Sequence, residues 1–208
     1  MIEIFQGARP PAGHRLTDGM HRDRKRVFVD LLKWDVPVVG GQFEIDQFDT
    51  ERAIYLIAAN ERGDHLGSIR LLPTDGDHIL GTIFPQLCED AVPTSPRIYE
   101  ISRGCLSPGL KAAARREVRN ALTTAAVEFA LLQEIESYTC IADAGWLSQI
   151  LSLGWDCWPL GLPQKIGRSL TGALRIEIGP QTLRQLQDAG TYMSYPLKMA
   201  DAPRQVAA

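Results

Sequence analysis

Residues 53–73 read AIYLIAANERGDHLGSIRLLP and contain two runs rich in aliphatic and aromatic side chains. The two runs, 53–59 and 66–72, are separated by the residues NERGD at positions 60–64. Asparagine, glycine and aspartate are typical of tight turns because they adopt turn conformations at low cost. The stretch therefore predicts two antiparallel strands joined as a hairpin.

Helical and strand-like segments continue on both sides of this hairpin. Before it, apolar residues at helical spacing predict a helix over 18–34, and the glycines and proline of 36–47 predict a loop. After it, the expected elements are a strand at 97–103, a helix at 110–134, a strand at 137–142, a helix at 143–153, and strands at 155–159 and 173–178. This alternation predicts an α/β fold in which helices pack on the faces of a mixed sheet.

Length and composition restrict the class of protein. The chain has 208 residues, of which 45% are hydrophobic and 23% charged, so we expect one globular domain at 1–198 and a flexible tail at 199–208. The formal net charge of -3 gives no overall basic field, and no nucleic-acid partner is expected. No apolar run approaches the ~20 residues of a membrane span. With no signal-peptide pattern at the start, we expect a cytoplasmic protein without a membrane partner.

Cysteine and histidine spacing gives no sign of a metal site. The four cysteines are far apart in the sequence and form no C-x-x-C pair, and the four histidines form no ligand pair at helical spacing. A structural zinc site needs such pairs. No bound metal is expected.

Arg24 is a charged residue on the apolar face of the predicted helix. It shares a stripe with Val27, Phe28 and Leu31, which follow it by three, four and seven positions. One interpretation is a side-chain stem along the edge of the core with its charged head in water. The other is an arginine that lines a cleft and binds a carboxylate through two hydrogen bonds. The pattern alone leaves both open.

Three carboxylates follow Trp34 within a short stretch. Glu44, Asp46 and Asp49 lie after a glycine-rich loop and beside aromatic residues. Solvated loop acids are one explanation. A site for a bound cation is the other, since a cation is attracted both by carboxylates and by the faces of aromatic rings.

Charged residues also occur within apolar strands. Arg70 lies in one strand and Glu100 and Arg103 in another. Such residues usually face solvent or pair with one another, but three of them also fit a polar cleft. Alternation in a regular strand puts Glu100 and Arg103 on opposite faces, so a shared cleft requires a bulge or a strand end between them.

Taken in order, these residues form an extended signature. It reads Arg24-x3-Phe28-x5-Trp34, Glu44-x-Asp46-x-Phe48-Asp49, Gly67-Ser68-x-Arg70-Leu71-Leu72-Pro73-Thr74, Phe84-Pro85 and Glu100-x-Ser102-Arg103. The signature resembles that of the acyl-homoserine-lactone synthases, the autoinducer synthases of bacterial quorum sensing. Its motifs cover about 24–103, and weaker similarity continues to 154–155. Gly104 departs from the pattern, since many members carry an aromatic residue there.

The resemblance implies a fold and a reaction. The fold is three-layer α/β/α with a mixed, mostly antiparallel, twisted sheet, similar to that of the N-acetyltransferases. The reaction moves an acyl group from acyl carrier protein, or alternatively from acyl-coenzyme A, to the amine of S-adenosylmethionine. The carboxylate of that molecule then closes a lactone and expels methylthioadenosine. S-adenosylmethionine is consumed as a substrate, and we expect no cofactor and a monomeric enzyme.

The resemblance also implies roles for the unusual residues. The S-adenosylmethionine site would contain Arg24, Phe28, Trp34, Asp46, Asp49 and Arg103. An ammonium must lose a proton before it attacks a thioester, so a general base is required, and Glu100 is the candidate, acting directly or through one water. Arg103 and Arg70 would complete the catalytic group, with Arg70 either orienting substrate or bracing the loop acids.

The second half of the chain supplies candidates for the acyl donor. The predicted acyl pocket includes Leu122, Phe129, Thr139 and Trp146, although apolar residues here suit an ordinary core equally well. Thr139 is similar in position to a residue that senses a substituent at the third acyl carbon in some family members. The predicted docking surface for the acidic carrier protein consists of Lys111, Arg115, Arg116 and Arg119, and a solvated helix face is the alternative.

Two other functions compete with this interpretation. One is an acetyltransferase-like enzyme that acylates a different amine, but residues 104–111 lack the glycine-rich spacing with which that class holds a pyrophosphate. The other is a binding module that senses S-adenosylmethionine or an acyl thioester without turnover.

Overall fold

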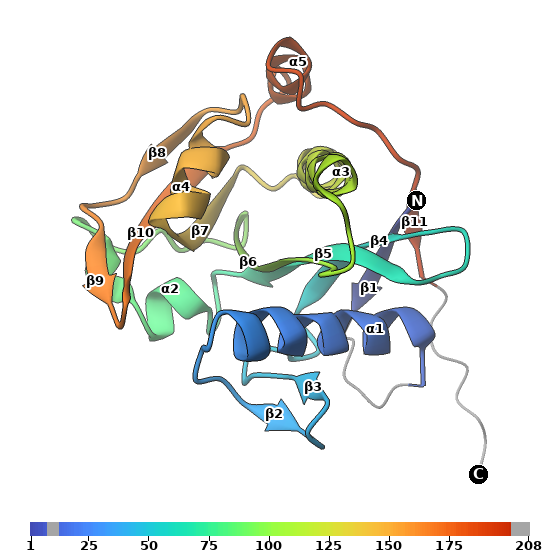
Figure 1. Ribbon diagram of the computed structural model, residues 1–208. Helices are drawn as coiled ribbons and strands as arrows, with labels where there is room; N and C mark the ends of the chain where they lie inside the picture. The colour runs from blue at the N-terminus through green and yellow to red at the C-terminus, as the bar shows by residue number, and fades with distance from the viewer. Residues whose placement is uncertain (8–12, 201–208) are drawn as a thin grey trace.

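A nine-stranded sheet forms the middle layer of the part of the chain that the computed structural model describes, residues 1–7 and 13–200 (Figure 1). Eight strands lie in the order β11-β1-β4-β5-β6-β7-β10-β8, and β9 pairs with β10. Their bounds are β1 Ile2–Gln6, β4 Ile54–Ala59, β5 His65–Pro73, β6 Ile98–Leu106, β7 Ser137–Asp143, β8 Cys157–Pro159, β9 Gln164–Ile166, β10 Ser169–Glu177 and β11 Leu197–Met199.

The sheet is mixed and mostly antiparallel, as expected. Only β1 with β11 and β6 with β7 run parallel among the described strand pairs. The hairpin predicted from residues 53–73 is present as β4 and β5. Its turn is closed by Asn60, whose Oδ1 accepts the backbone N–H groups of Arg62 and Asp64, each at 2.9 Å.

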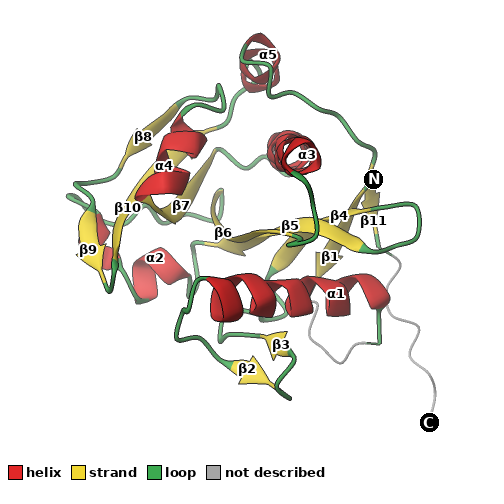
Figure 2. Cartoon of the chain, in the orientation of Figure 1, coloured by secondary structure: helices red, strands yellow, loops and turns green. Residues whose placement is uncertain are grey.

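Helices cover both faces of the sheet, so the three-layer prediction is confirmed (Figure 2). α1 and α2 lie on one face, and α3, α4 and α5 lie on the other. The bounds are α1 Arg15–Arg24, α2 Ile79–Thr82, a 3-10 turn η2 Pro85–Leu87, α3 Ala112–Leu132, α4 Ala144–Leu151 and α5 Thr182–Asp188. Within the described residues, none of the helices has the length and apolar character needed to cross a membrane.

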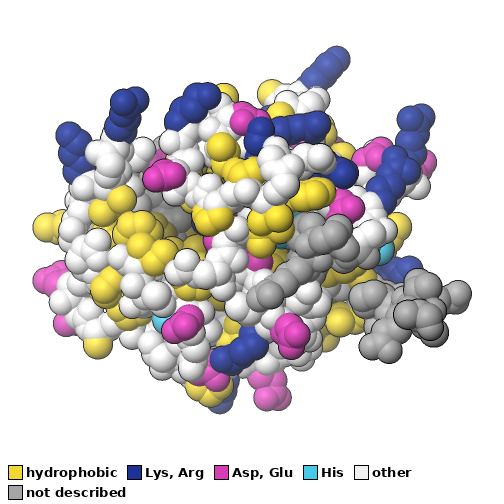
Figure 3. Space-filling model, turned by 90° about the horizontal axis from the view of Figure 1, so that it is seen from below, with side chains coloured by type: hydrophobic (Ala, Val, Ile, Leu, Met, Phe, Trp, Pro, Cys, Tyr) yellow, Lys and Arg dark blue, Asp and Glu magenta, His cyan; other side chains and the backbone are white. Residues whose placement is uncertain are grey.

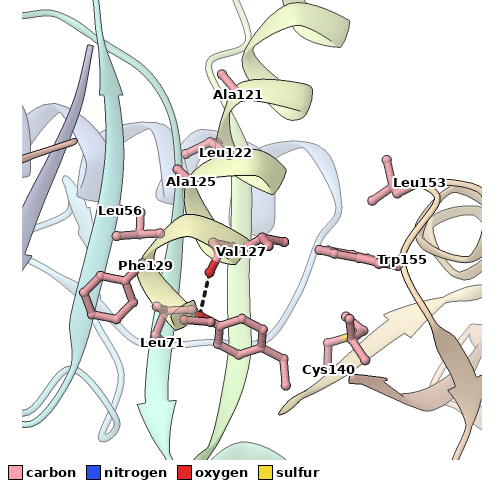
Figure 4. Packing of buried hydrophobic residues seen from close by; sticks show 14 of the residues in the cluster. Leu56, Leu71, Ala121, Leu122, Ala125, Val127, Phe129, Cys140, Leu153 and Trp155 are labelled. Carbon is pink, nitrogen blue, oxygen red and sulfur yellow. Dashed lines mark hydrogen bonds between the residues drawn. The ribbon is translucent and has the colours of Figure 1, made fainter. Parts of the chain in front are cut away.

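Apolar side chains fill the interfaces on both sides of the sheet. β4 shows why, because its side chains alternate: Leu56 packs in the cluster under α3, whereas Tyr55 and Ile57 pack on the side of α1. Figure 4 shows the α3 side, where the Tyr138 hydroxyl donates to the Ala126 carbonyl at 2.9 Å.

The helix predicted over 18–34 is divided into two parts. After α1 the chain continues as a π-helix, η1 Lys25–Leu31, and leaves it at Lys33, whose φ is 59°. The wider π-helical turn changes the direction of the side chains that follow Arg24. The segment 36–47, predicted as a loop, contains a short hairpin of β2 Val38–Val39 and β3 Phe43–Glu44.

The C-terminal prediction needs a correction at its boundary. Met199 lies in β11 and pairs with Ile4, and the N–H of Ala200 donates to the Ile4 carbonyl at 2.9 Å. These two residues are therefore held by the sheet rather than belonging to a loose tail. The pairing comes from a strand at the other end of the chain, so local sequence gave no sign of it. The rest of the predicted tail, 201–208, lies outside the described residues.

Candidate active site

Arg24 lies at the centre of a buried ionic network. Its Nε donates to Glu44 Oε2 at 2.5 Å, and its two terminal nitrogens donate to the two oxygens of Asp49, both at 2.8 Å. All three side chains are fully buried. Of the two interpretations left open for Arg24, burial excludes a charged head in water. The side chain points inward, and its bidentate partner is a carboxylate of the protein itself.

Arg70 extends the network across the sheet. It binds both oxygens of Asp46, at 2.6 and 3.0 Å, and lies 2.9 Å from Asp49. Its Nε donates to the Ser102 hydroxyl on the neighbouring strand at 3.0 Å. Of the two roles left open for Arg70, the geometry favours bracing the loop acids.

Arg103 carries the network to the surface of a cavity. Its Nε lies 3.1 Å from Glu44 and its Nη2 lies 2.6 Å from Asp46. Its guanidinium carbon lies 5.5 Å from the ring centre of Phe28 and 5.8 Å from that of Trp34, and these two rings stack at 4.7 Å. The cation is thus held by carboxylates on one side and by aromatic faces on the other.

A β-bulge explains how Arg103 reaches this position. The β5–β6 register shifts between Ser68 and Arg70, which places both Arg103 and Gly104 opposite a single residue, Ile69. Arg103 has φ 50°, an unusual conformation for a residue other than glycine. Because of the extra residue, Glu100 and Arg103 share one side of β6, which was the condition for a common cleft.

The network is electrically balanced, with three arginines and three carboxylates. Burial raises the pKa of Asp49, but Arg24 and Arg70 outweigh it and hold the pKa far below its usual range. Burial likewise raises the pKa of Asp46, and Arg70 and Arg103 more than offset it. Both acids therefore stay ionised at neutral pH, and each charge has a partner.

The cavity beside Arg103 has a volume of about 250 Å³. It lies where β6 and β7 separate, since these strands pair only as far as Ile101 and Cys140. Its wall therefore takes residues from both faces of the sheet. Those on the α1 and α2 side include Phe28, Leu32, Trp34, Ser68, Ile79, Phe84, Glu100 and Arg103, and those on the α3 and α4 side include Arg119, Leu122, Thr123, Ala126, Trp146, Gln149, Leu153 and Trp155.

One border of the cavity reaches the outer surface. Figure 3 shows the molecule from below the sheet of Figure 1, with hydrophobic side chains in several groups on this face and charged side chains between and around them. Leu32 and Trp34 line the cavity and are each 42% exposed. These apolar groups beside a partly open cavity are typical of a ligand site.

Glu100 is a buried carboxylate on the cavity wall. Its two oxygens accept the backbone N–H groups of Ile79 and Leu80 at the start of α2, at 3.0 and 2.6 Å. Burial raises the pKa of Glu100 above its ordinary value, although the two N–H groups and His78 act in the opposite direction. A carboxyl group with a raised pKa is better matched to proton transfer near neutral pH.

The predicted S-adenosylmethionine residues fall into two groups. Phe28, Trp34 and Arg103 line the cavity, as does the predicted base Glu100. Arg24, Asp46 and Asp49, together with Arg70 from the predicted catalytic group, belong to the ionic network and are not on the cavity wall. These four side chains hold Arg103 in position from behind the cavity wall. Their direct contact with S-adenosylmethionine stays a prediction.

Two of the four residues predicted for the acyl pocket lie on the wall of this cavity. Leu122 and Trp146 lie on the cavity wall, whereas Phe129 and Thr139 do not. Phe129 lies on the Leu56 and Leu71 side of α3, in the core (Figure 4). Thr139 alternates with the α3-facing residues of β7, so it lies on the opposite face, next to Glu100 in the β6–β7 ladder. The sequence did not determine which face of β7 or of α3 each of these residues occupies. Those faces decide which side chains reach the cavity.

The predicted basic surface is also divided. Lys111, the residue before α3, and Arg116 on α3 are exposed, and Arg115 is partly buried. Arg119 instead lies on the cavity wall and donates to Asn120 Oδ1 at 3.0 Å and to Gln149 Oε1 at 3.3 Å. Because its guanidinium links α3 to α4, Arg119 does not belong to a freely solvated patch.

Several cavity residues were not predicted. Leu32, Ser68 and Ile79 line the cavity, but each reads as an ordinary helix or strand residue in the sequence. The sequence did give a sign of open space at Gly104, because many family members carry an aromatic residue at this position. A Cβ at Gly104 would meet no atom within 4 Å, and the residue lies on the cavity wall.

Metal ligands do not converge at this site. Over residues 1–7 and 13–200, no group of three His, Cys, Asp or Glu side chains is arranged to hold a metal ion.

Comparison with known proteins agrees with this geometry. Residues 12–186 match the family model described as autoinducer synthase. The chain is 29% identical over 184 residues to an acyl-homoserine-lactone synthase of Pseudomonas aeruginosa, covering 85% of this chain and 89% of that protein. It is 32% identical over 178 residues to an acyl-homoserine-lactone synthase of Rhizobium etli, covering 83% and 82%.

Solved structures show the same relationship. The chain resembles BjaI, a CoA-dependent acyl-homoserine lactone synthase solved with SAM and isopentyl-CoA, with a TM-score of 0.84, 28% identity, and coverage of 98% of this chain and 94% of that one. A putative N-acetyltransferase from Lactobacillus plantarum has a TM-score of 0.57 at 14% identity, over 86% of this chain and 99% of that one. This second likeness concerns the fold alone.

Proposed function

The chain belongs to the autoinducer synthase family, and we propose that its cavity is where an acyl thioester and S-adenosylmethionine are converted into an N-acyl-L-homoserine lactone and methylthioadenosine. Membership in this family makes it an acyl-homoserine-lactone synthase, an acyltransferase of quorum sensing.

We base the proposal that S-adenosylmethionine binds in this cavity on the contact of Arg103 with the stacked Phe28 and Trp34 rings. That substrate presents a carboxylate, an ammonium, a sulfonium and an aromatic base. The guanidinium suits the carboxylate, and the aromatic faces suit the sulfonium and the base. The remaining charges of the ionic network fix Arg103 in place, so the site is ordered before the substrate arrives.

Glu100 is the proposed general base. It takes one proton from the substrate ammonium, directly or through one water, and the neutral amine then attacks the thioester carbonyl. As the C–S bond breaks, the thiolate leaves and takes up a proton, while the nitrogen loses its second proton and becomes an amide. The substrate carboxylate then attacks its own γ-carbon and expels methylthioadenosine. We propose that no resident cofactor takes part, since S-adenosylmethionine is itself consumed.

The apolar part of the cavity is the proposed acyl site. Leu122, Ala126, Trp146 and Trp155 line it on the α3 and α4 side of the sheet. An acyl chain gains about 0.8 kcal/mol for each CH₂ group removed from water, so such a wall favours binding of an aliphatic donor.

We propose acyl carrier protein as the main donor, with acyl-coenzyme A as the alternative. The exposed cations Lys111 and Arg116, at the start of α3, support docking of an acidic carrier. The CoA-dependent relative BjaI supports the alternative. We further propose that the enzyme acts as a monomer in the cytoplasm, without a nucleic-acid or membrane partner.

The test is a coupled product assay. Purified protein is incubated with S-adenosylmethionine and a series of acyl-carrier or acyl-coenzyme A donors, and methylthioadenosine and the lactone are measured by mass spectrometry. Both products are expected in equal amounts with at least one donor series. No methylthioadenosine with any donor would overturn the proposal and favour a binding module.

A further inference from the structure

A serine, a histidine and an aspartate form a hydrogen-bonded chain beside the cavity. The Ser68 hydroxyl lies 3.1 Å from Nε2 of His65, and Nδ1 of the same ring lies 2.8 Å from Oδ2 of Asp23. All three side chains are buried, and Ser68 lies on the cavity wall. These distances match those of a nucleophile, a general base and the group that orients the base.

A second β-bulge creates this arrangement. His65 and Ser68 are three positions apart and would face opposite sides of a regular strand. The β4–β5 register shifts between Ala58 and Ala59, which leaves Leu66 as an extra residue of β5. The bulge brings both side chains to the α1 face, where Asp23 is supplied by α1.

The partners assign the direction of each hydrogen bond. The Asp23 carboxylate can only accept, so the Nδ1–H of His65 donates to it, and Nε2 of the same ring accepts from the Ser68 hydroxyl. Burial raises the pKa of Asp23, but hydrogen bonds from His65 and Ser107 outweigh it and leave the pKa below its ordinary value. An ionised Asp23 stabilises the imidazolium that forms when His65 takes a proton.

The thiol of Cys105, next to Ser68, is not activated as a nucleophile in the same way. Cys105 pairs with Ser68 in the β5–β6 ladder and also lies on the cavity wall. Burial raises the pKa of Cys105 to about 12, so it stays protonated at neutral pH. Of these two nucleophile-bearing side chains, Ser68 is the one with a base in contact.

We propose that Ser68, His65 and Asp23 form a second catalytic site, which cleaves the acyl thioester donor when no amine is in position. This inference rests on the proposed function, because it uses the same donor in the same cavity. Ser68 Oγ attacks the thioester carbonyl while His65 Nε2 takes the hydroxyl proton. The C–S bond breaks, the departing thiolate takes that proton, and an acyl ester on Ser68 remains. A water, deprotonated by His65, attacks the ester and releases the carboxylic acid, and the returned proton restores the serine hydroxyl.

Thiol release in the absence of S-adenosylmethionine tests the proposal. Full-length protein is incubated with butanoyl-, octanoyl- and dodecanoyl-coenzyme A, and free coenzyme A is followed with a thiol-reactive dye. Ser68→Ala and His65→Gln are each expected to lower the rate at least about 100-fold, the lower range for loss of a general base. Ser152→Ala, at an exposed position at the end of α4, is the matched control and is expected to keep the wild-type rate.

Covalent labelling gives a readout that a structural role would not change. A fluorophosphonate probe is expected to label wild-type protein once, at Ser68 by peptide mapping, and not to label His65→Gln. The labelling site is measured on the wild-type protein. The experiment therefore tests whether Ser68 is the nucleophile even if Ser68→Ala fails to fold. Labelling at another residue, or no labelling together with no thiol release, would overturn the proposal.

The parallel synthase assay separates the two proposals. Methylthioadenosine formation with neither thiol release nor labelling removes the second site and leaves the synthase intact. Thiol release at Ser68 without methylthioadenosine under any condition keeps the second site and overturns the proposed amine transfer.

Discussion

Glu100 and Arg103 lie on the same side of β6 although three positions separate them, because Arg103 is the extra residue of a β-bulge. The bulge puts a carboxylate of raised pKa and a guanidinium backed by aromatic rings on the wall of one cavity. Proton removal and substrate binding can therefore occur within one site.

Glu100→Gln is expected to lower kcat by about 10²- to 10⁴-fold, the usual contribution of a general base. S-adenosylmethionine affinity should stay within a few fold, since the swap is nearly isosteric and Arg103 is unchanged. Methylthioadenosine release gives kcat, and titration calorimetry gives the affinity. Glu61→Gln, in an exposed turn, is the control. Undiminished kcat would assign the base role to another group.

The pH profile of kcat should carry the signature of Glu100. Its folded-state pKa is raised, so the acid limb of the profile should lie above the ordinary glutamate value of about 4.3. Activity should rise as pH increases through that limb, because only the ionised carboxylate accepts a proton. The measurement is kcat against pH with saturating substrates. A limb at or below the ordinary value would contradict the role.

Asp49→Asn is expected to destabilise the fold by about 3 to 5 kcal/mol, because it leaves the buried Arg24 and Arg70 without a full complement of negative charge. The folded-state pKa of Asp49 is lowered, so its contribution is present above the unfolded value of about 3.9 and is lost as pH falls below it. Chemical denaturation at neutral pH measures the change. Asp75→Asn, which removes an exposed ion pair to Arg52, should change stability by no more than about 1 kcal/mol.

Gly104→Phe is expected to narrow the cavity without unfolding the protein. A side chain there begins in open space and lies on the cavity wall. The ratio of kcat/KM for long to short acyl donors should fall by about tenfold or more, the effect of losing one or two buried CH₂ groups. Competition between octanoyl and butanoyl donors measures it, with Gly109→Phe, also free of contacts, as control. An unchanged ratio would place the acyl chain elsewhere.

Lys111→Glu combined with Arg116→Glu is expected to raise KM for an acyl-carrier donor by about tenfold at low salt, because both cations are exposed at the start of α3. KM for S-adenosylmethionine should not change, and the effect should shrink as salt screens the charges. Arg62→Glu, in the β4–β5 turn, controls for a general change of charge. An unaltered donor KM would remove this helix face from the docking surface.

Much of the architecture followed from local patterns. The hairpin of β4 and β5, the long helix α3 and the β7–α4 unit all carry strong periodicity, because each must bury one face or stripe of apolar side chains. Elements with short or weak local signals escaped prediction. β11 exists because β1 offers it hydrogen bonds, and α2 begins where Glu100 accepts its first two free N–H groups.

The sequence by itself determined the class of site: its arginines, acids and aromatic residues, in their order, identified the family and the chemistry. Only the tertiary structure decided which of these groups reach the cavity. Arg24 and Arg70 are buried in the ionic network, whereas Arg103 reaches the cavity wall. The reason is strand phase. One inserted residue reverses the face on which a side chain lies, and the two bulges are defined by pairing with neighbouring strands, which no local pattern contains.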